Sequence, residues 1–94
     1  MPRTVKSAVR ALEVLELFDR LQREASVGEV ARLLGYPLSS TSVLLSTMMG
    51  CGYLRAGAAQ HTYVPTPRLA RLGAWIGPFW NSAPARDRHL RRAS

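Results

Sequence analysis

The sequence predicts a mainly helical domain with one small β-hairpin, in the order helix, helix, helix, strand, strand, helix. Three observations support this fold class. Apolar residues recur at spacings of three and four between residues 7 and 50. Glycine and proline divide that region into separate helical segments. Two short runs of β-forming residues then follow, over 53–55 and 62–64.

The first helix is expected over residues 7–22, a stretch without glycine or proline. Ser7 is the expected N-cap, because a serine oxygen can accept a hydrogen bond from a free amide at a helix start. The acidic residues of this segment lie off the main apolar stripe. That stripe is predicted to contain Ala8, Ala11, Leu12, Leu15, Phe18 and Leu21, with Leu17 on its flank.

The second helix has the clearest boundaries. Ser26 is followed three residues later by Glu29, which matches a capping box, in which each side chain binds the other residue's free amide. Gly35 stands where a left-handed C-terminal cap favours glycine. The buried stripe between these signals is predicted to be Val27, Val30, Ala31 and Leu34.

The third helix is expected over residues 39–50, with Ser39 or Ser40 as its cap. Helical geometry divides its residues into two faces. The inward face is predicted to contain Thr41, Leu44, Leu45 and Met48. The outward face is uncharged and comprises Ser39, Val43, Ser46 and Gly50 at its centre, flanked by Ser40, Ser42 and Thr47.

A hairpin is predicted over residues 53–65, with strands 53–55 and 62–64. Thr66 and Pro67 then favour a fourth helix that runs toward Ile76 and is stopped by Gly77 and Pro78. We therefore divide the chain into a domain over residues 1–78 and a basic, weakly patterned tail over 79–94. Three aromatic residues near this boundary are expected either to cap the core beside the first helix or to form a dimer interface: Trp75, Phe79 and Trp80.

The length of 94 residues fits one small domain, and the formal net charge is +7. The charge favours an anionic partner, although an excess of this size also serves solubility alone. Cys51 is the only cysteine, so no internal disulfide forms, and one cysteine with two distant histidines does not make a zinc site. No signal peptide or sufficiently long apolar run is present, so we expect a cytoplasmic protein without a membrane span.

The second and third helices are joined by a short turn that begins with glycine, which is the spacing of a DNA-binding helix-turn-helix. The hairpin would form a wing beside it, giving a winged helix-turn-helix. We expect double-stranded DNA to be bound by helix 39–50 in the major groove and by the hairpin on the phosphate backbone. The candidate DNA contacts are Ser39, Ser40, Ser42, Val43, Ser46, Thr47, Arg55, Gln60, Arg32, Arg3 and Lys6.

Four segments, 7–15, 26–36, 37–45 and 52–54, resemble the N-terminal domain of IclR-type bacterial transcriptional regulators. The resemblance extends over about residues 5–76 and implies a winged helix that binds operator DNA, usually as a homodimer. The family normally adds a large C-terminal effector-binding domain, for which these 94 residues leave no room, so we do not expect ligand sensing to carry over. The family also often places an arginine in the third helix where this sequence has Val43.

An enzyme is not expected, because the acidic residues gather on the first helix and no Ser-His-Asp-like or phosphate-loop pattern is present. No cofactor is expected either. Two alternatives to a DNA-binding regulator remain open at this stage. One is a winged-helix module that binds proteins and has lost specific DNA binding. The other is a fragment of a longer regulator.

Overall fold

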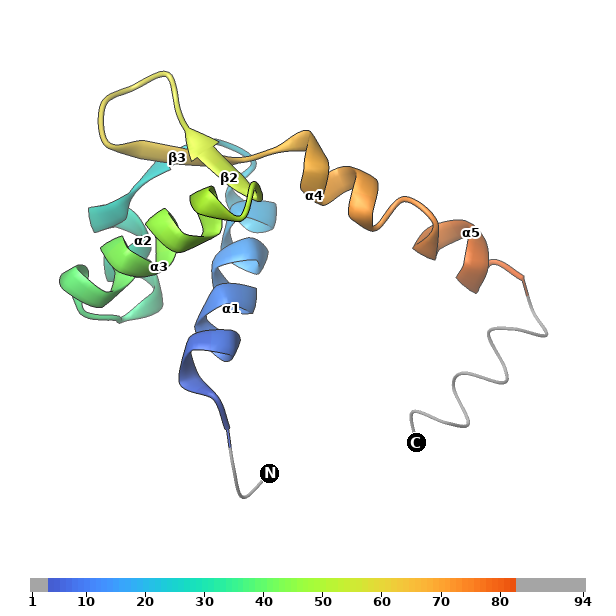
Figure 1. Cartoon of the computed structure of the whole chain (residues 1–94), viewed down its shortest axis with the longest axis horizontal. Helices are drawn as coiled ribbons and strands as arrows, with labels where there is room; N and C mark the ends of the chain where they lie inside the picture. The colour runs from blue at the N-terminus through green and yellow to red at the C-terminus, as the bar shows by residue number, and fades with distance from the viewer. Residues whose placement is uncertain (1–3, 83–94) are drawn as a thin grey trace.

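Three helices pack around one core, and a small sheet lies across their end (Figure 1). The computed structural model describes residues 4–82. The elements confirm the predicted class of a mainly helical winged domain. In chain order they are α1 (Lys6–Leu21), β1 (Ala25–Ser26), α2 (Val27–Leu34), α3 (Leu38–Gly50), β2 (Leu54–Ala56), β3 (Thr62–Pro65), α4 (Pro67–Leu72) and α5 (Ile76–Trp80).

The core is assembled from α1, β1, α2, α3 and β2, and its buried members are Val14, Leu17, Phe18, Ala25, Val30, Leu45, Met48 and Leu54. The predicted face of α1 was partly wrong. Leu12 is 62% exposed, whereas Val14 is fully buried. Because apolar residues occur on most sides of α1, their spacing alone did not determine which side faces the core. Ser7 is not the cap either, since the N-cap of α1 is Val5.

The sheet contains one strand more than the predicted hairpin. Its order is β1-β3-β2 with antiparallel pairing, and Ala25 of β1 lies opposite Tyr63 of β3. Strand β2 begins one residue later than expected, at Leu54, which pairs with Pro65. The preceding residue, Tyr53, instead links helix and hairpin, because its amide donates to the Met48 carbonyl at 3.0 Å. The two-residue strand β1 therefore ties the hairpin to the chain between α1 and α2.

The signals that bound α2 are confirmed in part. Ser26 Oγ accepts a hydrogen bond from the Glu29 amide at 3.1 Å, as an N-cap should. Gly35 caps the other end in the left-handed region, with φ of 73°. The Glu29 side chain, however, forms a bidentate pair with Arg23. The Glu29 carboxylate therefore binds Arg23, six residues earlier, and not the Ser26 amide that the capping box predicted.

The start of α3 differs from the prediction, which placed the cap at Ser39 or Ser40. The N-cap is Pro37, and the helix begins at Leu38. The Ser40 and Thr41 hydroxyls both donate to the Pro37 carbonyl, at 3.3 and 2.8 Å. These side chains therefore lie within the first turn, where they bind a carbonyl rather than cap free amides.

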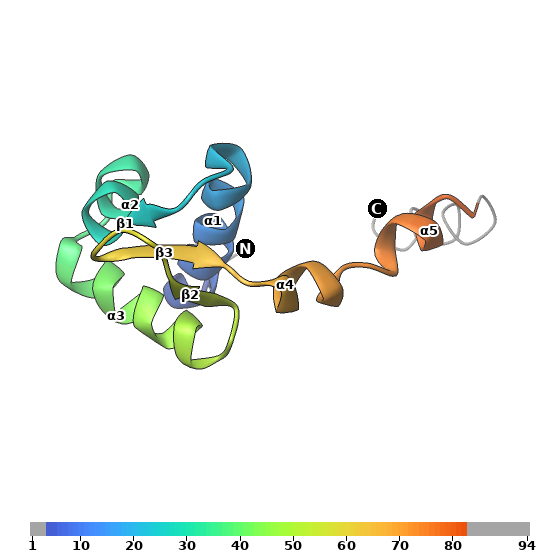
Figure 2. The same ribbon diagram turned by 90° about the horizontal axis from the view of Figure 1, so that it is seen from above.

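The single fourth helix that was expected is divided into α4 and α5, and the predicted stop at Gly77 and Pro78 was wrong. Pro78 lies within the first turn of α5, where a helix does not need the missing amide hydrogen. Neither α4 nor α5 has a buried residue, and Figure 2 shows both extending away from the helical body. Trp75 is 61% exposed and meets Phe79 edge to face at 5.4 Å, so it does not cap the core.

Candidate nucleic-acid interface

Helix α3 has two faces with different environments. Thr41, Leu45 and Met48 are buried, and Leu44 packs partly against the core, as predicted. The opposite side is exposed along its length and carries Ser39, Ser40, Ser42, Val43, Ser46 and Thr47. At 1.5 Å per residue, this 13-residue helix is about 20 Å long. The core thus holds one side of α3 and leaves the other open to a partner.

The exposed side of α3 carries short hydroxyl side chains and one branched apolar residue. Val43, at its centre, is 66% exposed. The Thr47 hydroxyl donates to the Val43 carbonyl at 2.8 Å, so its lone pairs remain available as acceptors. Ser46 Oγ lies 3.5 Å from the Tyr63 hydroxyl, where either group can donate. This contact joins the exposed face of α3 to strand β3.

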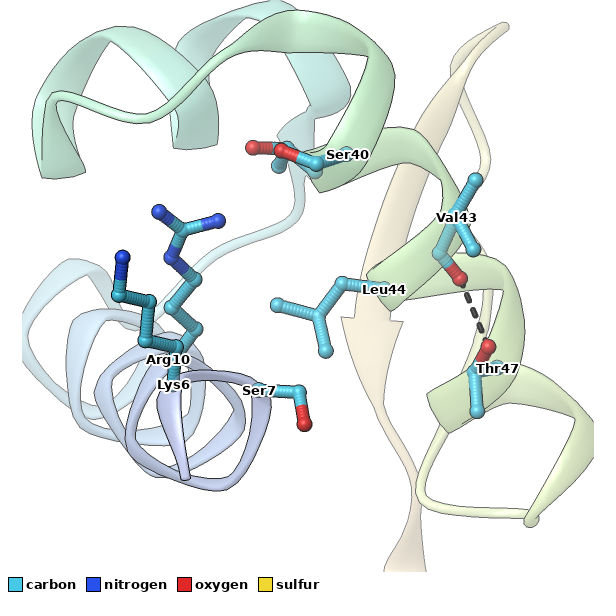
Figure 3. A pocket seen from close by; sticks show the side chains of 8 residues that line it. Lys6, Ser7, Arg10, Ser40, Val43, Leu44 and Thr47 are labelled. Atoms are coloured by element: carbon cyan, nitrogen blue, oxygen red, sulfur yellow. Dashed lines mark hydrogen bonds between the residues drawn. The ribbon is translucent and has the colours of Figure 1, made fainter. Parts of the chain in front are cut away.

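A groove of about 350 Å³ separates the start of α1 from α3 (Figure 3). Lys6 and Arg10 line its α1 side and extend toward the end of α3 that carries Ser40. The Arg10 guanidinium also lies over the Tyr36 ring, 4.4 Å from its centroid, which gives this cation a fixed position. Lys6 was a predicted contact, whereas Arg10 was missed. Their spacing of four residues on one helix was the available sequence signal.

The hairpin lies beside the C-terminal half of α3, and the two enclose a second groove of about 330 Å³ lined by Met49 and residues 56–63. Gln60 and His61 are exposed in the connecting loop, and His61 adopts a left-handed conformation with φ of 60°. Arg55 pairs with Val64, whereas the next residue along pairs with Tyr63, which contacts α3. Because side chains alternate across a sheet, Arg55 lies on the face turned away from α3.

Glu24, which the sequence analysis did not select, holds the loop of the hairpin. Its two carboxylate oxygens accept hydrogen bonds from the Ala58 amide at 3.0 Å and the Ala59 amide at 2.8 Å. The Thr62 hydroxyl lies 3.1 Å from the same carboxylate. These bonds, first from Ala59, then Ala58, then Thr62, lower the pKa of Glu24 below its ordinary value of 4.5. The carboxylate is therefore charged at neutral pH, and each of its oxygens accepts a hydrogen bond from the loop.

Carboxylates are absent from the sequence between Val30 and Ser82, a stretch that includes α3 and the hairpin. Glu29, just before it, is paired with Arg23 at 2.6 Å. The hydrogen bond from Arg23 lowers the pKa of Glu29. Arg32 is exposed on the outer side of α2, and Arg3 lies outside the described residues. The segments that form α3 and the hairpin thus contribute no carboxylate of their own to this surface.

Within residues 4–82, no group of three or more histidine, cysteine or acidic side chains is arranged to hold a metal ion. The same stretch contains no helix with the length and apolarity needed to cross a membrane. Within residues 4–82, the candidate nucleic-acid interface is formed by α3, the groove lined by Lys6 and Arg10, and the neighbouring hairpin.

A core-held helix after a three-residue turn, with a hairpin beside it, defines the class of winged helix-turn-helix domains. The model of the IclR helix-turn-helix domain matches residues 7–57, which is more than half of the chain. The chain belongs to the IclR family.

Solved structures with the same fold include an IclR transcriptional regulator from Alicyclobacillus acidocaldarius, with 27% identity and a TM-score of 0.71 over 77% of this chain and 29% of that one. An IclR family transcriptional regulator from Brucella abortus is 31% identical, with a TM-score of 0.70 over 80% of this chain and 28% of that one. HmgR of Pseudomonas aeruginosa shares the fold at 24% identity, with a TM-score of 0.69 over 95% and 39% of the two chains. No curated protein matches the sequence. The chain spans less than a third of the first two structures.

Proposed function

We propose that this chain binds double-stranded DNA in a sequence-dependent manner, with α3 in the major groove. The observation that carries the proposal is the division of α3 into a core-locked side and an exposed side rich in hydroxyl groups. A helix with its side chains is about 10–12 Å wide, which matches a major groove of about 12 Å. The membership of the chain in a helix-turn-helix family supports the same assignment.

Affinity would come chiefly from basic residues that neighbour α3. Lys6 and Arg10 stand beside its N-terminal end, where they can neutralise phosphates along one edge of the groove. Arg32, exposed on α2, is a candidate for the backbone that this helix crosses. On the wing, Gln60 lines the groove beside α3 and is a candidate contact. We assign Arg55 to a phosphate on the outer face of the hairpin. Arg3 is retained as a contact from the arm before α1.

Base recognition would rest on hydroxyl and methyl groups. Serine and threonine can donate to or accept from base edges, and Val43 can pack against the methyl group of thymine. No arginine is present on α3 to form the bidentate guanine contact, which contributes roughly 1–3 kcal/mol of discrimination. We therefore expect a modest preference among base sequences, and we expect part of that preference to depend on the shape of the DNA.

The first two solved relatives are named as transcriptional regulators. We infer that this chain provides the DNA-binding part of such a regulator, acting in a bacterial cytoplasm as a homodimer. Leu72, Trp75 and Ile76 are 58%, 61% and 42% exposed, which supports contact with a second copy. We assign neither a catalytic activity nor a cofactor to this chain.

The test compares two substitutions that place the same charge on two exposed helical positions. Val43 on α3 is 66% exposed and Leu12 on α1 is 62% exposed, so neither Val43→Glu nor Leu12→Glu buries a charge. Binding sites are first selected from randomised duplexes, and affinity is then measured by fluorescence anisotropy between 50 and 200 mM salt. We expect wild-type affinity to fall steeply with salt.

Val43→Glu should weaken duplex binding by about tenfold or more, because it replaces an apolar contact with a negative charge close to the phosphates. Leu12→Glu should stay within about twofold of the wild type, because it lies on the acidic side of α1. Equal binding by wild type and Val43→Glu would remove α3 from the interface. Circular dichroism of both variants establishes that each remains folded.

A second candidate function is contact with a protein through the same face. It is favoured by Val43 at the centre of that face, which is 66% exposed, together with Leu38 and Met49 near the two ends of α3, which are 59% and 40% exposed. Salt dependence separates the two functions. Phosphate contacts give a steep decrease of duplex affinity with salt, whereas an apolar protein contact changes little.

A further inference from the structure

We infer that Glu24 is a positioning residue that fixes the wing relative to α3. The inference rests on the proposed function, because it concerns how the hairpin is presented to a duplex. Glu24 lies in the segment between α1 and β1, far in sequence from the loop that it binds. Its carboxylate receives two backbone amides and a hydroxyl from that loop and from the first residue of β3.

The carboxylate is attached to a rigid part of the molecule. The next residue, Ala25, is 1% exposed and pairs with Tyr63 across the sheet. Tyr63 in turn packs against the core and contacts Ser46 of α3. Glu24 therefore connects the tip of the hairpin to the same framework that holds α3. A loop attached in this way keeps a defined distance from α3.

The hairpin needs such a connection, because an isolated two-stranded hairpin is marginally stable in water. Without Glu24, the Ala58 and Ala59 amides would face only solvent. With it, they form charge-assisted bonds of 3.0 and 2.8 Å, a class roughly twice as strong as neutral hydrogen bonds. The same bonds occupy both amides, so a phosphate near the loop would have to be bound by Gln60 or His61.

Gly57 provides an independent steric observation. Its amide donates to the Thr62 carbonyl at 2.8 Å, which closes the loop. A Cβ atom at position 57 would clash first with the Thr62 hydroxyl, and it would lie 2.9 Å from the Glu24 carboxyl carbon and from Oε2, closer than real Cβ atoms approach. The absence of a side chain at this position thus leaves room for both the Glu24 carboxylate and the Thr62 hydroxyl that lies against it.

The test uses the full chain and distinguishes the effect of Glu24 on the position of the loop from the effect of its negative charge on DNA. Glu24→Gln has the size of the native residue but replaces one acceptor oxygen by a donor that faces an amide. Glu16→Gln on exposed α1 removes the same charge away from the wing and serves as the control. Loss of a negative charge by itself should favour DNA. A fall in affinity for Glu24→Gln therefore requires a positional cause.

Amide hydrogen exchange of Ala58 and Ala59 is measured first, without DNA. We expect exchange about tenfold faster in Glu24→Gln, the factor for loss of one hydrogen bond to a charged group, and unchanged rates in Glu16→Gln. Duplex affinity should then fall several-fold in Glu24→Gln alone. Wild-type affinity and exchange protection should also fall together as Glu24 is protonated at acidic pH, and this pH step should be absent in Glu24→Gln.

Unchanged exchange in Glu24→Gln, or affinity equal to that of Glu16→Gln, would overturn the inference. If the wild type itself fails to bind duplex, the proposed function fails, while the exchange rates still decide whether Glu24 fixes the loop. Gly57→Ala is the second variant, should Glu24→Gln not fold. It should produce the same faster exchange with the carboxylate chemically intact, and native rates in it would contradict the assigned geometry.

Discussion

Leu45 and Val43 stand two residues apart on α3, yet the structure gives them opposite roles. Leu45 is fully buried in the core, and Val43 is 66% exposed. Truncation of a buried leucine to alanine costs about 2–5 kcal/mol, because transfer energy is lost and a cavity remains. Truncation of an exposed side chain usually changes stability by less than about 0.5 kcal/mol. Since small domains have unfolding free energies of about 5–15 kcal/mol, Leu45→Ala should remove a large share of the total.

Urea unfolding followed by circular dichroism measures this difference. With a slope of about 2 kcal/mol per molar urea, Leu45→Ala should lower the unfolding midpoint by about 1–2.5 M and Val43→Ala by much less. Duplex binding should show the reverse order, with Val43→Ala weakened and folded Leu45→Ala close to the wild type. Equal destabilisation by the two variants would mean that Val43 faces the interior, and the interface would then have to be placed elsewhere.

Two other predictions concern charged groups. Arg10→Ala should lower duplex affinity and reduce the slope of log affinity against log salt by about 0.9, because one phosphate contact is lost. Arg20→Ala, at the exposed far end of α1, is the matched control, and an equal change in both would contradict the groove assignment. The pKa of Glu24 and that of Glu29 are both lowered in the folded chain. Their stabilisation is therefore present above pH 4.5 and lost as the pH falls through the lower folded pKa values, so the Tm should fall in acid. Glu24→Gln should flatten that profile, and an identical profile for wild type and variant would refute the assignment.

The elements with local boundary signals were predictable from sequence. Ser26 and Gly35 enclose α2 as expected, because N-caps and left-handed C-caps are set by residues within one helical turn. The two faces of α3 were also predictable, since its buried residues fall on one side at helical spacing. The same reasoning failed for α1, where apolar residues on several sides left more than one face possible, and Leu12 was placed inside.

Features that depend on distant contacts were not predictable. Strand β1 is two residues long and exists only through its pairing with β3, which lies more than thirty residues away in the sequence. Glu24 shows no distinctive local pattern, and its role depends on amides 34 and 35 residues further along. Arg10 likewise gains its place beside α3 from helix packing and from the ring of Tyr36. The candidate side chains of α3 and several basic or polar groups around it, Lys6 among them, could thus be proposed from the sequence, whereas the places of Arg10 and Glu24 required the fold.

The basic residues and the exposed face of α3 lie on different helices, and this has a consequence for DNA binding. The exposed side of α3 carries no ionisable group, whereas the nearest cations belong to α1. Phosphate contacts supply affinity without reading sequence, and base contacts supply discrimination. Changes at Lys6 or Arg10 should therefore weaken binding to all duplexes alike, while changes at Ser42 or Val43 should alter the ranking of sequences. The two properties can be varied independently only because different elements carry them, and Glu24 keeps a third element, the wing, in a fixed relation to both.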